Sequence, residues 1–114
     1  MKKASLVDDL QYNENKPAVQ VLFDTESSKE IRIAMRKGHV MKEHKTPYPI
    51  VVEIFEGHIQ FGIKGEFNEL KKGDLVFLEG NVPHDLEALQ DSTIRLTLTK
   101  ADTAERVKGV ADNS

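Results

Sequence analysis

The side chains in this sequence that are best suited to metal binding or acid–base chemistry are its four histidines, His39, His44, His58 and His84. Neutral imidazole is a good ligand for zinc, nickel, iron and copper, and it changes its charge near neutral pH. The chain has no cysteine, which excludes disulfides, thiolate metal ligands and a cysteine nucleophile. Any transition-metal site would therefore use imidazole nitrogens, with or without a carboxylate.

Other patterns that would indicate catalysis do not occur in the sequence. No serine lies in a G-x-S-x-G context, no H-E-x-x-H pair of zinc ligands is present, and no glycine-rich loop resembles a phosphate-binding loop. His39 and His58 each follow a glycine that signals a turn, so we expect both to be solvated turn residues. The role of the histidines therefore depends on the elements that position them.

These elements are expected to be β-strands, because hydrophobic residues recur at every second position in several short runs. The alternating runs are residues 19–23, 31–36, 58–63 and 93–99. Two denser runs, 50–55 and 75–78, are typical of strands that are covered on both faces. Glycine-centred turns separate the runs at short intervals, which indicates an antiparallel sandwich or barrel rather than βαβ units.

The pattern as a whole predicts one all-β domain over residues 1–114, with a barrel over about residues 17–99. A chain of 114 residues suits a single hydrophobic core. We expect roughly eight to ten strands. Helix is expected only near the ends, over residues 5–10 and 103–110. The five phenylalanines are expected to lie in the core.

The composition is that of a mildly acidic globular protein, with a formal net charge of −3 at pH 7. Lysines and glutamates are interspersed, so no basic patch follows a phosphate backbone, and we expect no nucleic-acid partner. No apolar run approaches the roughly 20 residues that cross a bilayer, which argues against a membrane span. Acidic residues arrive before any apolar segment that could act as a secretion signal, so we expect a cytoplasmic protein.

The glycines and histidines of the central region have a definite spacing. The positions concerned are Gly38, His44, Gly57, Gly73 and His84. This spacing resembles the two motifs of the cupin superfamily, written G-x5-H-x-H-x3-E-x6-G and G-x5-P-x-G-x2-H-x3-N. The resemblance covers about half of the chain directly, and it is most specific over the segment that begins Gly73-Asp74 and ends Val-Pro-His84. It implies an antiparallel jelly-roll barrel, known as the cupin barrel, with short terminal helical segments.

The sequence departs from these motifs at positions that matter for a metal. Cupins that hold a metal typically use three histidines and one glutamate, and this chain keeps His44 and His84. The second histidine of the first motif falls on Thr46, and the glutamate falls on Ile50. The resemblance therefore implies an incomplete ligand set for one divalent metal (Zn, Ni, Fe or Cu).

Residues around this pair are expected to line a ligand site in the barrel. Thr46, Ile50 and Tyr48, which is bracketed by two prolines at an expected bulge or loop, are the ligand-lining candidates. Glu53 is the nearest carboxylate, but if Ile50 points inward along a regular strand, Glu53 points outward. His84 shares its parity with two apolar positions, Leu86 and Ala88, which favours an inward-pointing imidazole.

Three functions are compatible with these sequence features. The first is a cupin-type module that binds a small organic ligand in its lumen, with or without a metal at His44 and His84. The second is a metal-dependent enzyme similar to cupin dioxygenases or isomerases, in which the metal acts as a Lewis acid. The third is a metal-free barrel that acts through its surface as an interaction or accessory subunit. The fold alone does not decide between them.

A homodimer is also expected. The family resemblance implies it, and the apolar strand predicted near residues 18–23 would be an uncovered edge in a monomer. Exposed edges of this kind are usually covered or paired with another chain.

Overall fold

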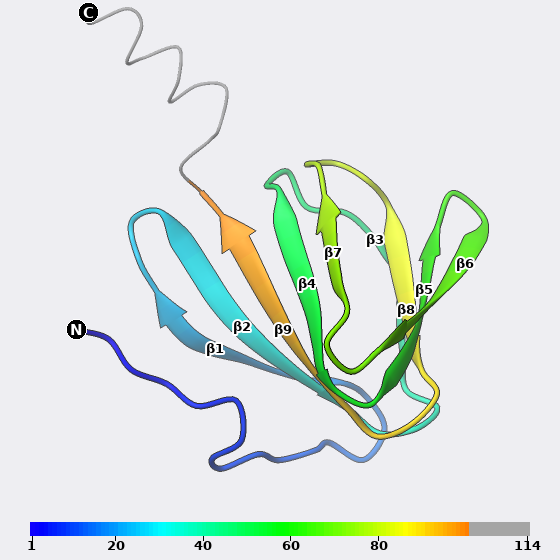
Figure 1. Ribbon diagram of the computed structural model, residues 1–114, viewed down its shortest axis with the longest axis horizontal. Helices are drawn as coiled ribbons and strands as arrows, with labels where there is room; N and C mark the ends of the chain where they lie inside the picture. The colour runs from blue at the N-terminus through cyan, green and yellow to red at the C-terminus, as the bar shows by residue number, and fades with distance from the viewer. Residues whose placement is uncertain (101–114) are drawn as a thin grey trace, which may run out of the picture.

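The computed structural model describes residues 1–100 and contains nine β-strands over that range (Figure 1). The strands are β1 (Ala18–Asp24), β2 (Ser28–Met35), β3 (Val40–His44), β4 (Ile50–Glu56), β5 (His58–Ile63), β6 (Glu66–Lys71), β7 (Leu75–Leu78), β8 (His84–Ala88) and β9 (Ser92–Thr99). All strand pairs are antiparallel. The predicted all-β class is therefore confirmed, and the strand number lies within the expected range. Among the described residues, no helix is long and apolar enough to cross a bilayer.

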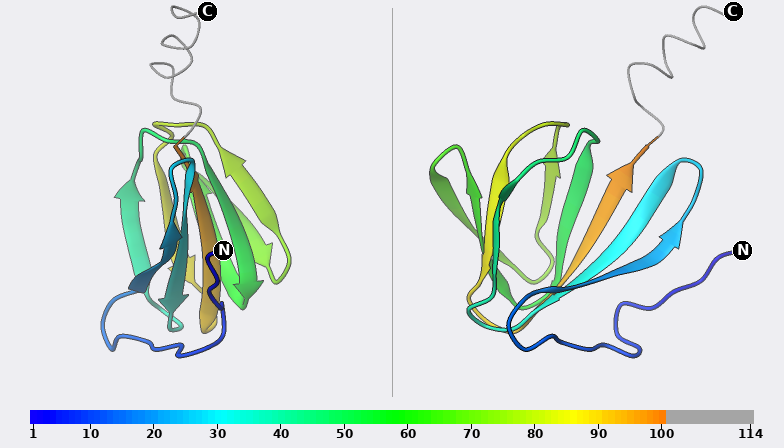
Figure 2. Two further views of the ribbon diagram at one scale, coloured as in Figure 1. Left: turned by 90° about the vertical axis from the view of Figure 1, so that its left-hand side faces the viewer. Right: turned by 180° about the vertical axis from the view of Figure 1, so that it is seen from behind.

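The strands form two sheets that face each other. The larger sheet has the order β1-β2-β9-β4-β7, and the smaller sheet has the order β3-β8-β5-β6. Most consecutive strands lie in opposite sheets, which is the connectivity of a jelly roll. The two sheets approach each other at one end of the molecule and diverge toward the other (Figures 1 and 2). We call the diverging end, where the β3–β4 and β7–β8 loops lie, the open end.

The hydrophobic core lies between the two sheets, where the period-two pattern places every second side chain. Its largest fully buried apolar members are Met35, Ile50, Val52, Ile54, Ile59, Phe61 and Ile94. Ile33 on β2 pairs with Ile94 on β9, which in turn pairs with Ile54 on β4. Alternation within a strand and register between strands therefore agree, and the inner face of the larger sheet is continuously apolar.

Two expectations about hydrophobic residues were wrong. Strand β7 was expected to be covered on both faces, but Leu75 and Phe77 are 66% and 58% exposed. Of the phenylalanines, Phe61 lies in the core, whereas Phe67 on β6 is exposed. The reason is the same in each case. These side chains point away from the space between the sheets, and no other described residue covers them there.

The segment before β1 was expected to contain a helix over residues 5–10, and it does not. It crosses the larger sheet as an extended strap with a turn near Asp9, which has a φ of 53°. The guanidinium of Arg32 on β2 donates to the carbonyl oxygens of Ser5, Asp8 and Asp9, at 2.9 to 3.3 Å. A helix would have required intrahelical partners for such carbonyls. The other expected helix, over residues 103–110, lies outside the described residues.

Candidate functional site

His44 and His84 lie directly opposite each other at the open end of the barrel. His44 ends β3, His84 begins β8, and the two residues are register partners in the smaller sheet. Their ring centroids are 4.4 Å apart, with the ring planes at 60°. A register shift between Met41 and His44 brings the two imidazoles together. The pair joins residues that are far apart in the sequence, as the spacing of the motifs predicts.

Each imidazole of the pair is held by a backbone carbonyl two residues earlier. His44 Nδ1 lies 2.6 Å from the carbonyl oxygen of Lys42, and His84 Nδ1 lies 2.9 Å from that of Val82. A carbonyl oxygen only accepts hydrogen bonds, so in each neutral ring Nδ1 carries the proton and donates it. Both Nε2 atoms therefore keep their lone pairs. This is the tautomer in which an imidazole binds a metal or accepts a ligand's hydrogen bond through Nε2.

The two histidines differ in their exposure. His84 is 3% exposed and stacks on the Phe61 ring, with centroids 5.6 Å apart and planes 9° from parallel. Burial lowers the pKa of His84 below its ordinary value, and the neighbouring His44 lowers it further, against the opposing effect of the Val82 carbonyl. His84 is therefore neutral at pH 7. His44 is exposed at the rim, so the pair has one buried and one accessible member.

The rim beside the histidines is formed by the β3–β4 and β7–β8 loops, which pack on each other. Asn81 N donates to the carbonyl oxygen of Thr46 at 2.7 Å. Gly80 lies so close to the carbonyl of Pro47 that a Cβ at position 80 would overlap it. Tyr48 N is 3.4 Å from the Thr46 hydroxyl oxygen, and both residues are half-buried. Thr46 and Tyr48 thus belong to the loop that borders the histidine pair.

Two further residues named from the sequence do not take part in this arrangement. Ile50 is 2% exposed and pairs with Leu78 and Leu98 in the larger sheet, so it belongs to the core. Glu53 points away from the lumen, with its carboxylate 3.6 Å from the Arg95 guanidinium, as the strand parity predicted. In residues 1–100 no three histidine or acidic side chains converge on a common point that could hold a metal ion.

The other two histidines were expected to be solvated, and this expectation was wrong. His39 is 9% exposed, and its Nδ1 accepts a hydrogen bond from Arg36 N at 3.1 Å. Its Nε2 must then carry the proton, which it donates to the carbonyl oxygen of Glu14 at 3.1 Å. His58 Nε2 is buried without a hydrogen-bond partner, 3.7 Å from a carboxylate oxygen of Glu69. Only the long-range packing reveals these surroundings, because the sequence near each histidine reads as a turn.

Comparison with known proteins gives a clear result for the fold and none for a specific function. No protein-family model matches the sequence, and no curated protein matches it either. Solved structures do match. An RmlC-like cupin protein from Desulfovibrio desulfuricans is 16% identical, with a TM-score of 0.80 over 87% of this chain and 96% of that protein.

Two more solved structures agree with this match. A conserved protein with a double-stranded β-helix domain from Klebsiella pneumoniae is 16% identical, with a TM-score of 0.78 over 91% of this chain and 93% of that protein. A cupin superfamily protein from Desulfitobacterium hafniense is 11% identical, with a TM-score of 0.73 over 79% and 83% of the two chains. This chain has the cupin fold. Sequence identities this low establish the cupin fold only, so the chemistry must be inferred from the site itself.

Within the cupin barrel, the histidine pair fits one kind of metal site and not another. Two neutral imidazoles with free Nε2 atoms suit a borderline divalent ion such as zinc, nickel or copper. The three-histidine, one-glutamate set that the motifs imply is not available, because Thr46 and Ile50 occupy the other two positions and Glu53 faces away. The residues present therefore fit a weak two-nitrogen site, with further ligand positions left to water or to a bound molecule.

Proposed function

We propose that this cupin barrel is a binding module, which takes a small organic ligand at its open end beside His44 and His84. The observation that supports this is the tautomeric state of the pair, because both Nδ1 atoms donate to backbone carbonyls and both Nε2 atoms remain free. Free Nε2 atoms accept hydrogen bonds from hydroxyl or protonated acidic groups of a ligand. The Phe61 ring, which is buried in the core, stacks on His84 and holds that imidazole in place.

The same two Nε2 atoms would hold a divalent transition metal, which would supply a positive charge that binds ligand oxygens. With two protein ligands the metal would be held weakly. The metal should also be lost below about pH 6, where free imidazole is protonated and stops being a ligand. Within the described residues the pair has no third histidine or acidic side chain placed to complete a metal site, so binding is the function that we propose for this arrangement.

Titration calorimetry with zinc chloride and with nickel chloride tests the metal part of the proposal. We expect one weak site in the wild type, no binding by His44→Ala or His84→Ala, and unchanged binding by His58→Ala, whose imidazole lies away from the pair. Circular dichroism should show that the variants keep their strand content, since the core is apolar. Binding by the double variant His44→Ala/His84→Ala equal to that of the wild type would refute the shared site.

A thermal-shift screen with small carboxylates, sugars and phenols, with and without zinc, tests the ligand part. A true ligand should raise the melting temperature of the wild type and of His58→Ala, and should leave that of His44→Ala unchanged. A compound that stabilises all three proteins equally binds elsewhere. If no compound acts on the wild type, the barrel is not the small-molecule module proposed here.

A further inference from the structure

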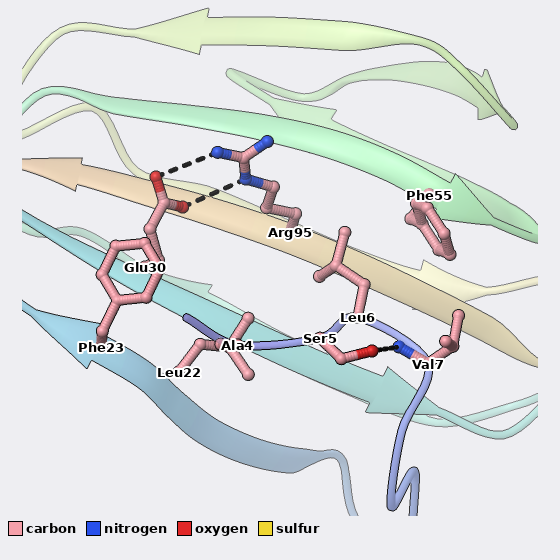
Figure 3. A pocket seen from close by; sticks show the side chains of 9 residues that line it. All are labelled: Ala4, Ser5, Leu6, Val7, Leu22, Phe23, Glu30, Phe55 and Arg95. Atoms are coloured by element: carbon pink, nitrogen blue, oxygen red, sulfur yellow. Dashed lines mark hydrogen bonds and ion pairs between the residues drawn. The ribbon is translucent and has the colours of Figure 1, made fainter. Parts of the chain in front are cut away.

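The larger sheet carries a cavity on the face that points away from the smaller sheet, and neither histidine of the pair lines it. The cavity has a volume of about 450 Å³ and lies between the sheet and the N-terminal strap (Figure 3). Small-molecule sites in proteins commonly have volumes of about 300 to 1,000 Å³ and mostly apolar walls. The apolar side chains of this wall are Leu6, Val7, Leu22, Phe23 and Phe55.

Two strand irregularities contribute to this wall. In β1, Leu22 is an extra residue between two positions that pair with consecutive residues of β2, and in β4 Phe55 is an extra residue in the same way against β9. Successive side chains of a regular strand point to opposite faces, whereas a bulge re-aims them. Leu22 and its neighbour Phe23 accordingly both line the cavity. The bulge in β1 thus adds apolar surface to the cavity that a regular strand would not supply.

The strap that covers the cavity is fixed by its own hydrogen bonds and by those of a buried arginine. The Ser5 hydroxyl oxygen accepts from Val7 N and Asp8 N at 3.1 and 3.0 Å. The guanidinium of Arg32, which is 3% exposed, holds the carbonyl oxygens of Ser5, Asp8 and Asp9. Because this cover is already in place, a ligand would not have to order it on binding.

The charges of the wall are paired with one another. Of the described residues that line the cavity, Glu30 and Arg95 alone are charged. Arg95 Nε and Nη2 each donate to the Glu30 carboxylate at 3.2 Å, and the Thr97 hydroxyl donates to it at 2.8 to 2.9 Å. Arg95 Nη1 lies 3.6 Å from a carboxylate oxygen of Glu53, so two carboxylates share one guanidinium.

This arrangement decides the charge of a suitable ligand. An anion would meet two carboxylates and a guanidinium that they already neutralise. A cation would have to leave water for an apolar cavity whose one carboxylate, that of Glu30, is 7% exposed and already satisfied. A neutral molecule avoids both costs and gains from burying its apolar surface.

We propose that the cavity under the strap is a second binding site, which takes a neutral, mainly hydrophobic small molecule. Figure 3 shows Leu6 of the strap between Arg95 and Phe55, above the sheet. Because a segment of the same chain covers the cavity, a small molecule fits it better than a flat protein surface does. The site lies on the opposite face of the larger sheet from the core, so it is independent of the histidine pair.

Fluorescence titration of the full chain with two dyes tests the proposal. N-phenyl-1-naphthylamine is neutral, and 8-anilinonaphthalene-1-sulfonate has the same ring system with an added negative charge. The wild type should bind one molecule of the neutral dye, at least about 10-fold more tightly than the sulfonate. Equal or tighter binding of the sulfonate would overturn the neutral ligand class. No binding of either dye would overturn the site.

Two variants locate the neutral dye. Leu6→Asp places a charge in the cavity, and Ala4→Trp fills the cavity without a charge. Each should weaken binding by about 30-fold or more, with strand content unchanged by circular dichroism. The matched control is Leu75→Asp/Phe77→Asp, which alters side chains that are 66% and 58% exposed on β7, outside the cavity. Loss of binding in this control, with binding retained in Leu6→Asp and Ala4→Trp, would place the dye on β7 and refute the site.

Two further variants separate this site from the open end of the barrel and test the strap. His44→Ala/His84→Ala should bind the neutral dye with wild-type affinity, and loss of binding would place the dye beside the histidine pair instead. Arg32→Met should weaken binding by about 10-fold, because the released strap must then become ordered on binding. Lys72→Ala removes an exposed ion pair with Glu56 and should have no effect. Unchanged binding by Arg32→Met would show that the strap does not form the site.

Discussion

Arg95 on β9 forms a two-bond ion pair with Glu30 on the neighbouring strand β2, with both N···O distances at 3.2 Å. The pair is unequal, since the Glu30 side chain is 9% exposed and that of Arg95 is 44% exposed. This pairing also raises the pKa of Arg95, chiefly through its hydrogen bonds to Glu30. The buried Glu30 carboxylate therefore needs Arg95 as a partner for its charge, whereas the exposed Arg95 guanidinium can also be solvated by water.

The first prediction concerns this asymmetry. Arg95→Met should lower the free energy of unfolding by about 2 kcal/mol, because it leaves a buried carboxylate with only the Thr97 hydroxyl as partner. Glu30→Gln/Arg95→Met should lose less, since no buried charge remains. Urea unfolding measures both variants against the wild type. A larger loss in the double variant than in Arg95→Met would contradict this account.

The second prediction concerns the N-terminal strap. Arg32 is 3% exposed and donates to three strap carbonyls and to Gln20 Oε1. Arg32→Met should release the strap and lower the free energy of unfolding by about 2–3 kcal/mol, because charge-assisted hydrogen bonds are lost and carbonyls lose their partner. Limited chymotrypsin digestion should then cleave near Leu10 sooner than in the wild type. Lys72→Ala removes an exposed ion pair with Glu56 and should change neither measurement.

The third prediction concerns pH. Burial lowers the pKa of His84 in the folded state, while the unfolded state keeps a value near 6.5. Below that pH the unfolded chain therefore binds a proton more readily than the folded one, so stability must fall as the pH drops. Well above that pH, His84 is neutral in both the folded and the unfolded state, so it contributes no pH dependence to the stability.

Urea unfolding from about pH 7.5 to about pH 5 should show this decline in the wild type, and a shallower decline in His84→Gln. The comparison uses the slope with pH, because the substitution itself changes the stability at every pH. Identical slopes in the two proteins would mean that His84 does not carry the effect.

The fourth prediction concerns the turn between β4 and β5. Gly57 has a φ of 101°, and a Cβ at this position would overlap the Ser92 hydroxyl oxygen. Gly65 has a φ of 78° and no atom within 4 Å of the position of a Cβ. Gly65→Ala should therefore cost only the left-handed backbone penalty, about 1–2 kcal/mol, and Gly57→Ala should cost that plus about 1–3 kcal/mol of overlap. A Cβ at position 57 would also overlap the backbone of Asp91 and Ser92, so equal losses in urea unfolding would show that this backbone segment moves aside freely.

Two sequence features predicted most of this fold, namely the alternation of apolar and polar residues and the glycines at turns. The runs around Ile33, Ile54, Phe61 and Ile94 became strands of the core, because a buried face must be apolar at every second residue. Gly57 and Gly73 have φ values of 101° and 92°, which explains why glycine stands at these reversals. Strand β6 was not predicted, because Leu70 is its only buried residue and the other side chains carry no apolar period.

The candidate site was predictable in part, for a similar reason. Register partners such as His44 and His84 were implied by the motif spacing, and the parity of β4 correctly placed Glu53 on the other face. The burial of His39 was not predictable, because it depends on Glu14, whose contact with His39 only the folded chain creates. The extended strap was unpredictable for the same reason. Arg32, on a strand distant in the sequence, binds carbonyl oxygens of residues 5–9 that a helix would use for its own hydrogen bonds.

The contact between the two loops at the open end has a consequence for how fast a ligand would bind. The hydrogen bond from Asn81 to Thr46 and the close approach of Gly80 to Pro47 join both sides of the rim before any ligand arrives. No loop then has to become ordered during binding, so little conformational entropy is lost in the bound state. Association should accordingly proceed in a single kinetic phase whose rate rises linearly with ligand concentration, without the plateau that a slow closing step produces.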